Sequence, residues 1–257
     1  MKIMIIANFK SNVINFDKWF DDFENLCSPV EFNFDESDLD LGIKHWPEVG
    51  IAPPSIYITE YSTPKLAIGA QDVDHSSGSR TGAISIEMLD EVGVEFVIIG
   101  HSERREFFHE DNDLIRKKIQ AVNESKIGSI ILCIGETKEE NKMGATKDVL
   151  KNQLSVINGF ELGKNFTIAY EPVWAIGSGQ TPEPKDINEI HKYIKDVVQS
   201  VSENNHVPDV VYGGSVTDKN AESFFKEEFV DGALVGGASL NGTTFANIVN
   251  IWRENII

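Results

Sequence analysis

Residues 166–179 read Phe-Thr-Ile-Ala-Tyr-Glu-Pro-Val-Trp-Ala-Ile-Gly-Ser-Gly, an apolar run that ends in the carboxylate Glu171 and is followed by a second apolar segment. The first five residues include β-branched and aromatic side chains, which are typical of a buried strand. Pro172 fixes the direction of the chain as it leaves the sheet. The sequence therefore predicts that Glu171 lies at the carboxyl end of a buried strand.

The segment after Pro172 is too apolar for an ordinary solvated loop. Val173 to Ile176 are all apolar, and Gly177 and Gly179 give the backbone freedom at the far end. An apolar loop with flexible ends indicates a lid that closes over a substrate and excludes water. We therefore expect Glu171 to act as a catalytic base beneath a lid.

The same strand signal recurs along the chain and alternates with amphipathic helices. One clear helix follows the 166–170 strand, with Pro184 in its first turn and apolar residues at helical spacing up to Val201. Repeated strand and helix predict an α/β fold with a parallel sheet buried on both faces. The predicted strands are Ile3–Ala7, Val49–Ala52, Leu66–Ala70, Phe96–Gly100, Ile130–Gly135, Phe166–Tyr170, Val210–Gly213 and Ala233–Val235.

The number of units decides between two architectures. An open, doubly wound sheet is compatible with the alternation, but eight units in 257 residues favour a closed (β/α)8 barrel. Barrels of this kind commonly form one domain of about 250 residues. We therefore expect a single domain over residues 1–257.

Composition narrows the possible partners. The net charge of -18 argues against binding to nucleic acid, so an anionic ligand would need a local positive site. Of the two cysteines, Cys133 lies within an apolar strand, which favours a reduced, cytoplasmic protein. Residues 232–252 lack charge, but asparagines and glycines interrupt them, and the apolar residues follow one helical stripe. No membrane span is therefore predicted.

Polar and glycine-rich motifs follow the carboxyl ends of the predicted strands. In a barrel, these motifs meet at one rim, which is the face that carries active sites. Two longer connections stand apart: an acidic surface insertion at Ser28–Glu48, and a Gly/Ser-rich loop at Gln71–Gly82 that either lines the site or binds a partner. The motifs are ANFKSN (7–12), GHSERR (100–105), CIGE (133–136), AYEPVWAIG (169–177), YGGSV (212–216) and DGALVGGASL (231–240).

Taken together and in this order, the motifs resemble those of the triosephosphate isomerase family. The resemblance implies a (β/α)8 TIM barrel that works as a homodimer in the cytoplasm without a cofactor or a metal. It also implies the interconversion of dihydroxyacetone phosphate and D-glyceraldehyde 3-phosphate in glycolysis and gluconeogenesis, through an enediolate. Two alternatives stay open: another phosphate-binding barrel enzyme, such as an epimerase or Schiff-base aldolase, and a catalytically silent barrel with a binding or structural role.

The resemblance also implies a role for each site residue. Glu171 moves the proton between neighbouring carbons, and His101 donates to the substrate oxygen as a neutral imidazole, which is the known arrangement of this family at a helix N-terminus. Lys10 supplies the positive charge, while Ser102 and Glu103 orient the helix start and Lys10. Catalytic roles fall to Glu171, His101, Lys10 and Asn8, and substrate binding to Asn8, Phe9, Lys10, Gly177, Ser215, Gly236 and Gly237.

Some positions depart from the family pattern. Ala83 stands where the family has a Glu that pairs with the equivalent of Arg104 across the subunit boundary, and Asp72 stands where Asn is usual. Gln180 and Pro182 replace a more common hinge sequence after the lid. We still expect a homodimer in which the Gln71–Gly82 loop places Thr81 beside the partner subunit's Lys10. The ion pair to Arg104 is not expected, because Ala83 has no carboxylate.

Overall fold

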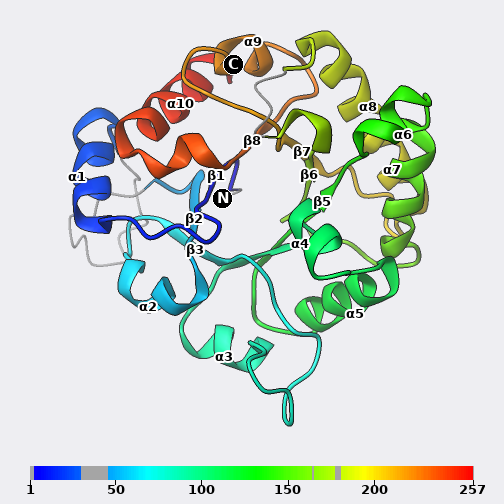
Figure 1. The fold of residues 1–257 in the computed structure, drawn as a ribbon, viewed down its shortest axis with the longest axis horizontal. Coiled ribbons are helices and arrows are strands. Elements are labelled where there is room, and N and C mark those ends of the chain that lie inside the picture. The colour runs from blue at the N-terminus through cyan, green and yellow to red at the C-terminus, as the bar shows by residue number, and fades with distance from the viewer. Residues whose placement is uncertain (1–2, 30–45, 164, 177–180, 257) are drawn as a thin grey trace.

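A computed structural model of the chain describes residues 3–29, 46–163, 165–176 and 181–256. Eight parallel strands form a closed barrel in chain order, and β1 pairs with β8 to complete it (Figure 1). The closed barrel predicted from the number of units is confirmed. The strands are β1 (Ile5–Asn8), β2 (Val49–Ala52), β3 (Ala67–Ala70), β4 (Phe96–Ile99), β5 (Ser129–Ile134), β6 (Phe166–Tyr170), β7 (Asp209–Tyr212) and β8 (Gly232–Val235).

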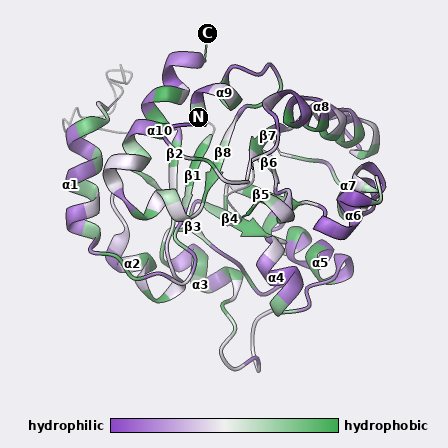
Figure 2. Ribbon diagram, turned by 45° about the horizontal axis from the view of Figure 1, so that its top comes forward, coloured by the Kyte–Doolittle hydropathy of each residue, from purple (hydrophilic) through white to green (hydrophobic). Residues whose placement is uncertain are grey.

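Helices surround the barrel and turn their apolar sides toward the strands (Figure 2). Within the described part of the chain, no helix is both long and apolar enough to cross a membrane. The α-helices are α1 (Phe16–Leu26), α2 (Ile58–Tyr61), α3 (Ile86–Glu91), α4 (Ser102–Phe107), α5 (Asn112–Asn123), α6 (Lys138–Lys142), α7 (Thr146–Leu154), α8 (Pro184–Val201), α9 (Ala221–Phe225) and α10 (Gly242–Asn255). Short 3-10 helices include η3 (Val173–Ala175) and η4 (Gly237–Leu240).

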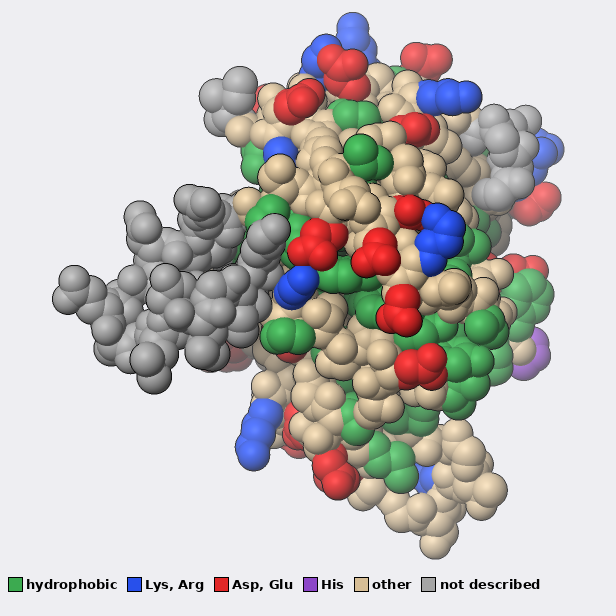
Figure 3. Space-filling model, turned by 90° about the vertical axis from the view of Figure 1, so that its left-hand side faces the viewer, with side chains coloured by type: hydrophobic (Ala, Val, Ile, Leu, Met, Phe, Trp, Pro, Cys, Tyr) green, Lys and Arg blue, Asp and Glu red, His purple; other side chains and the backbone are tan. Residues whose placement is uncertain are grey.

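The predicted helices have the expected buried faces. Helix α8 begins with Pro184 at its first turn and buries Ile187 and Ile194, while α10 buries the stripe that includes Phe245 and Trp252. Figure 3 shows acidic and basic side chains interspersed on one face, with no continuous basic surface there.

Several strand ends differ from the prediction by one or two residues. Strand β1 begins at Ile5, not Ile3, and Gly100, Gly135 and Gly213 lie just beyond their strands. Gly100 has a φ of 72°, a left-handed conformation that turns the chain out of the sheet and that glycine adopts without strain. These glycines therefore begin the connections that build the site.

Only the ends of the acidic insertion are described, because residues 30–45 lie outside the described ranges. Both ends contact Arg253 of α10. Its guanidinium donates to the carbonyl of Ser28 at 2.5 Å and to the carboxylate of Glu48 at 2.6 Å. The insertion thus leaves and rejoins the barrel at points fixed by the last helix.

Candidate active site

A cavity of about 370 Å³ lies at the carboxyl ends of the strands and brings together side chains from five connections. Lys10 follows β1, His101 follows β4, Glu171 follows β6, Ser215 follows β7, and Gly236 follows β8. Asn8 and Gly237 also line it. Residues as far apart in the sequence as Asn8 and Ala238 therefore line one volume at the predicted rim.

Glu171 is almost fully buried and directs its carboxylate to two donors. Its Oε1 lies 3.1 Å from Nε2 of His101, and its Oε2 accepts the backbone N–H of Ser102 at 3.0 Å. A β-carbon added at Gly213 would lie 2.7 Å from Cγ of Glu171, closer than real contacts allow. A glycine at position 213 is therefore what leaves room for this side chain.

His101 is the N-cap of α4, and its hydrogen bonds indicate a neutral ring. Its Nδ1 accepts the backbone N–H of Glu103 at 3.2 Å. An acceptor nitrogen carries no proton, so the ring proton belongs on Nε2, which faces Glu171. This arrangement leaves an N–H on Nε2 that can donate to an oxygen in the cavity.

Lys10 is held at both its backbone and its ammonium group. Its φ of 49° is unusual for a residue other than glycine. Asn8 Oδ1 accepts its N–H at 3.0 Å, and Nε2 of Gln71 donates to its carbonyl at 2.8 Å. Its Nζ lies 2.5 Å from Oε1 of Glu103. The contact agrees with the role expected for Glu103, which is to orient Lys10.

Two consecutive glycines, Gly236 and Gly237, also line the cavity. Gly237 begins η4, and a β-carbon added there would meet no other atom, so the space beside its backbone is open. At Gly236, an added β-carbon would lie 3.4 Å from Cε of Lys10. Glycine backbone near a lysine is suited to binding an anion. Gly177, also expected here, lies outside the described residues.

Phe9 is an exception among the predicted substrate contacts. Its side chain is fully buried and packs edge-on against Trp19, with ring centroids 5.4 Å apart. Its backbone N–H donates to Ala52, and it is not among the residues that line the cavity. We therefore assign Phe9 a packing role, because a Phe directly after the first strand fills the space between barrel and helix.

A buried carboxylate, Glu136, holds the start of the predicted lid. It accepts hydrogen bonds from Tyr170 Oη at 3.0 Å, Trp174 Nε1 at 2.8 Å and Asn141 Nδ2 at 3.0 Å. Burial, together with the negative charge of Glu136, raises the pKa of Tyr170. On the other side, Ser215 Oγ donates to the carbonyl of Ala175 at 2.7 Å. Sequence reasoning did not assign Glu136 a role, although it belongs to a motif that follows a strand.

Four charged side chains form a cluster at the base of the 71–82 loop. Arg104 lies 2.7 Å from Asp72 and 2.6 Å from Glu110, and Lys118 lies 2.6 Å from each of the same two carboxylates. Burial raises the pKa of Asp72, while the two cations oppose that shift. Arg104 thus has carboxylate partners within its own chain, although Ala83 offers none.

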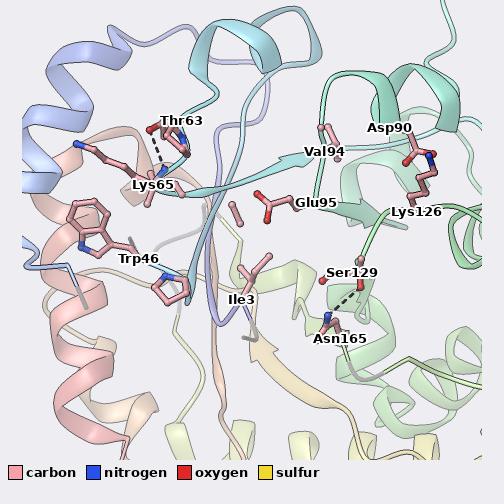
Figure 4. Close-up of a pocket in the computed structure, with 16 residues that line it drawn as sticks. Ile3, Trp46, Thr63, Lys65, Asp90, Val94, Glu95, Lys126, Ser129 and Asn165 are labelled. Carbon is pink, nitrogen blue, oxygen red and sulfur yellow. Dashed lines mark hydrogen bonds between the residues drawn. The ribbon is translucent and has the colours of Figure 1, made fainter. Parts of the chain in front are cut away.

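A larger cavity of about 580 Å³ lies at the opposite rim, near the amino ends of β3, β4 and β5 (Figure 4). Trp46, Lys65 and Glu95 are among its lining residues, and none of the candidate catalytic residues lines it. Across the described ranges, no group of three His, Cys, Asp or Glu side chains is placed to hold a metal ion. The chemistry expected from the sequence is therefore concentrated at the carboxyl-end cavity.

Comparison with known proteins shows which family the chain is similar to. Residues 3–252 match the family model described as triosephosphate isomerase. A relative from Legionella pneumophila (strain Paris), named triosephosphate isomerase, is 41% identical over 212 residues, which cover 79% of this chain and 84% of the relative. One from Erwinia tasmaniensis with the same name is 42% identical over 210 residues, covering 78% and 82% respectively.

Proposed function

Because the chain belongs to the triosephosphate isomerase family, we propose that the carboxyl-end cavity is where it interconverts dihydroxyacetone phosphate and D-glyceraldehyde 3-phosphate. The observation that carries this proposal is the 3.1 Å approach of Glu171 Oε1 to His101 Nε2 inside the cavity. One group is suited to accepting a proton from carbon, and the other to donating to oxygen. Both are needed for an isomerisation through an enediolate.

Glu171 acts as the base in this proposal. Its carboxylate removes a proton from the carbon beside the carbonyl and returns it to the neighbouring carbon, and its two equivalent oxygens suit both steps. His101 donates its Nε2 proton to the oxygen on which negative charge develops. Since the two groups now contact each other, the substrate must insert between them and replace their 3.1 Å contact.

The phosphate group lies at the glycine-rich end of the cavity. Lys10 supplies the positive charge that a protein with a net charge of -18 otherwise lacks at this site. Backbone N–H groups of Ser215, Gly236 and Gly237 donate to the phosphate oxygens, and Gly177 joins them from the lid. Asn8 adds a neutral donor, because its Oδ1 is already used by the Lys10 backbone.

The activity itself has a direct test. Purified protein is given D-glyceraldehyde 3-phosphate, and formation of dihydroxyacetone phosphate is followed through an NADH-dependent coupling enzyme. We expect turnover without any added cofactor or metal. Turnover that depends on an added metal, or no turnover in a folded protein, would favour the other barrel enzymes or the silent barrel.

We also propose that the chain works as a single-domain enzyme in the cytoplasm. One closed sheet with one continuous core supports the single domain. The two cysteines, Cys27 and Cys133, are buried and unpaired, and burial raises the pKa of Cys27 to about 11. Thiols that are buried and protonated fit a reducing compartment. Limited proteolysis that released a stable fragment smaller than the barrel would contradict the single domain.

The proposed homodimer uses the 71–82 loop, which projects from the barrel between β3 and α3 (Figure 1). Large apolar side chains are exposed in the segments after β1, β2 and β4: Val13, Ile56, Phe107 and Phe108. An association that buries them would remove apolar surface from water. Thr81 of the loop would then lie beside the partner subunit's Lys10.

Shortening the 71–82 loop tests the dimer. We expect a monomer by analytical ultracentrifugation, with much reduced activity because Lys10 loses a supporting contact. Shortening the 203–206 connection between α8 and β7, which lies at the amino-end rim of the barrel, serves as the control and should leave the assembly unchanged. Sedimentation of the native chain as a fully active monomer would refute the coupling of association to catalysis.

A further inference from the structure

Gln153, on α7, bonds both the backbone N–H and the backbone carbonyl of Gly135. Its Oε1 accepts the N–H of Gly135 at 2.8 Å, and its Nε2 donates to the carbonyl of the same residue at 2.9 Å. Gly135 is the first residue after β5, where the ladder between β5 and β6 has ended. At this residue, the partner of both backbone groups is a side chain and not another strand.

Gly135 lies directly against the backbone of Glu171. A β-carbon added at Gly135 would come within 1.7 Å of the carbonyl oxygen of Glu171, so the two backbones are in close contact. The residues on either side bond across the same gap: Glu171 N–H donates to Ile134 at 2.8 Å, and Val173 N–H donates to Glu136 at 3.1 Å. The position of Glu171 thus depends on where Gly135 lies.

These contacts point to a role for an amide that lies outside the cavity. We infer that Gln153 is a positioning residue: by fixing both the N–H and the carbonyl of Gly135, it fixes the surface against which the backbone of Glu171 packs. The inference rests on the proposed function of Glu171 as the base. An error of about 1 Å in the position of a reacting group can lower the rate about a hundredfold.

The chain offers a matched control at the opposite rim. Asn204, after α8, also bonds both groups of one residue, since its Oδ1 accepts the N–H of Leu162 at 3.3 Å and its Nδ2 donates to the Leu162 carbonyl at 2.9 Å. Leu162 precedes β6, at the end of that strand away from the cavity. Asn204→Leu therefore removes the same kind of interaction without disturbing the Glu171 backbone.

The experiment compares kcat, KM and urea unfolding for Gln153→Met and Asn204→Leu. We expect kcat of Gln153→Met to fall about ten- to a hundredfold, with KM changed less than about twofold because the phosphate end is untouched. Asn204→Leu should lose stability to a similar degree while keeping wild-type kcat. If Gln153→Met does not fold, Gln153→Glu, which keeps an oxygen for the Gly135 N–H, takes its place and should also lose kcat.

A second pair of variants tests the contact itself. Gly135→Ala places a methyl group against the Glu171 carbonyl and should lower kcat at least as much as Gln153→Met. Gly128→Ala, before the same strand, places a methyl group 3.7 Å from the nearest atom, an ordinary contact, and should keep wild-type kcat.

The inference is overturned if a folded Gln153 variant has the kcat of Asn204→Leu, or if Gly135→Ala matches Gly128→Ala. Its failure can be told from failure of the proposed function. If Glu171→Gln is inactive while Gln153→Met has wild-type kcat, only the positioning role of Gln153 is refuted. If Glu171→Gln is active, the assignment of Glu171 as the base is refuted, whatever the activity of the Gln153 variants.

Discussion

His191 gives a quantitative prediction about the core behind the catalytic strand. It is fully buried on α8, packs edge-on against Tyr170 with ring centroids 5.8 Å apart, and its Nδ1 lies 3.1 Å from the carbonyl of Phe229. Burial lowers the pKa of His191 from 6.5 to about 3. The folded protein therefore keeps this ring neutral at pH values where the unfolded chain protonates it.

The sign of the effect follows from the two pKa values. Well above pH 6.5 the ring is neutral in both the folded and the unfolded state, so it does not make the free energy of unfolding depend on pH. As the pH falls from 6.5 toward 3, the unfolded state gains a proton that the folded state cannot accept, so the free energy of unfolding decreases. One pKa unit corresponds to about 1.4 kcal/mol, so the loss between pH 7 and pH 4.5 is about 2.5 kcal/mol.

The assay is urea unfolding of the wild type and His191→Gln at pH 7 and pH 4.5, at one fixed protein concentration because association would contribute. Other acidic groups titrate equally in both proteins, so the difference between the two free energies of unfolding isolates the contribution of His191. Gln is neutral at both pH values, and the variant should be less stable at pH 7 because the buried packing is disturbed. That gap should shrink by about 2.5 kcal/mol at pH 4.5. A gap of equal size at both pH values would refute the reasoning.

Two further substitutions examine the site. Lys10→Met should lower kcat about 10²–10³-fold, since it removes the cation of the Lys10–Glu103 pair from the cavity, and kcat in the coupled assay within tenfold of wild type would count against a role for Lys10. Gly213→Ala should displace Glu171, whose Cγ lies 2.7 Å from the added methyl position, and lower kcat by about tenfold or more, with thermal unfolding measured to confirm the fold. An unchanged kcat in Gly213→Ala would show that the Glu171 side chain has room to move aside.

The sequence predicted the parts of the fold that depend on local pattern. The alternation of strands and helices identified eight strands, and the Pro184 helix and the α10 stripe match the structure because buried faces follow helical periodicity. Strand ends were less accurate: the pattern at 130–135 continues into Gly135, but the ladder stops at Ile134. Where a ladder stops depends on the neighbouring strand, which a local pattern does not contain.

Contacts between distant side chains could not be read from the pattern. Phe9 was expected to contact substrate and instead packs on Trp19, because adjacency to Lys10 in sequence does not fix the direction of a side chain. Glu136 and Gln153 were assigned no role, since Glu136 bonds Trp174, 38 positions away, and Gln153 bonds Gly135, 18 positions away. The partners of Arg104 were likewise invisible until folding placed Asp72 and Glu110 beside it.

The most direct test of the central claim is kcat of Glu171→Gln in the coupled assay with D-glyceraldehyde 3-phosphate. The change keeps the volume of the side chain and removes only the base, so the far-ultraviolet circular dichroism should be unchanged. Glu161→Gln, at an exposed position, serves as the matched control and should keep full activity. If Glu171 is the base, kcat of Glu171→Gln falls by at least about 10²–10⁴-fold. A variant that keeps more than about a tenth of wild-type kcat would contradict general-base catalysis by Glu171.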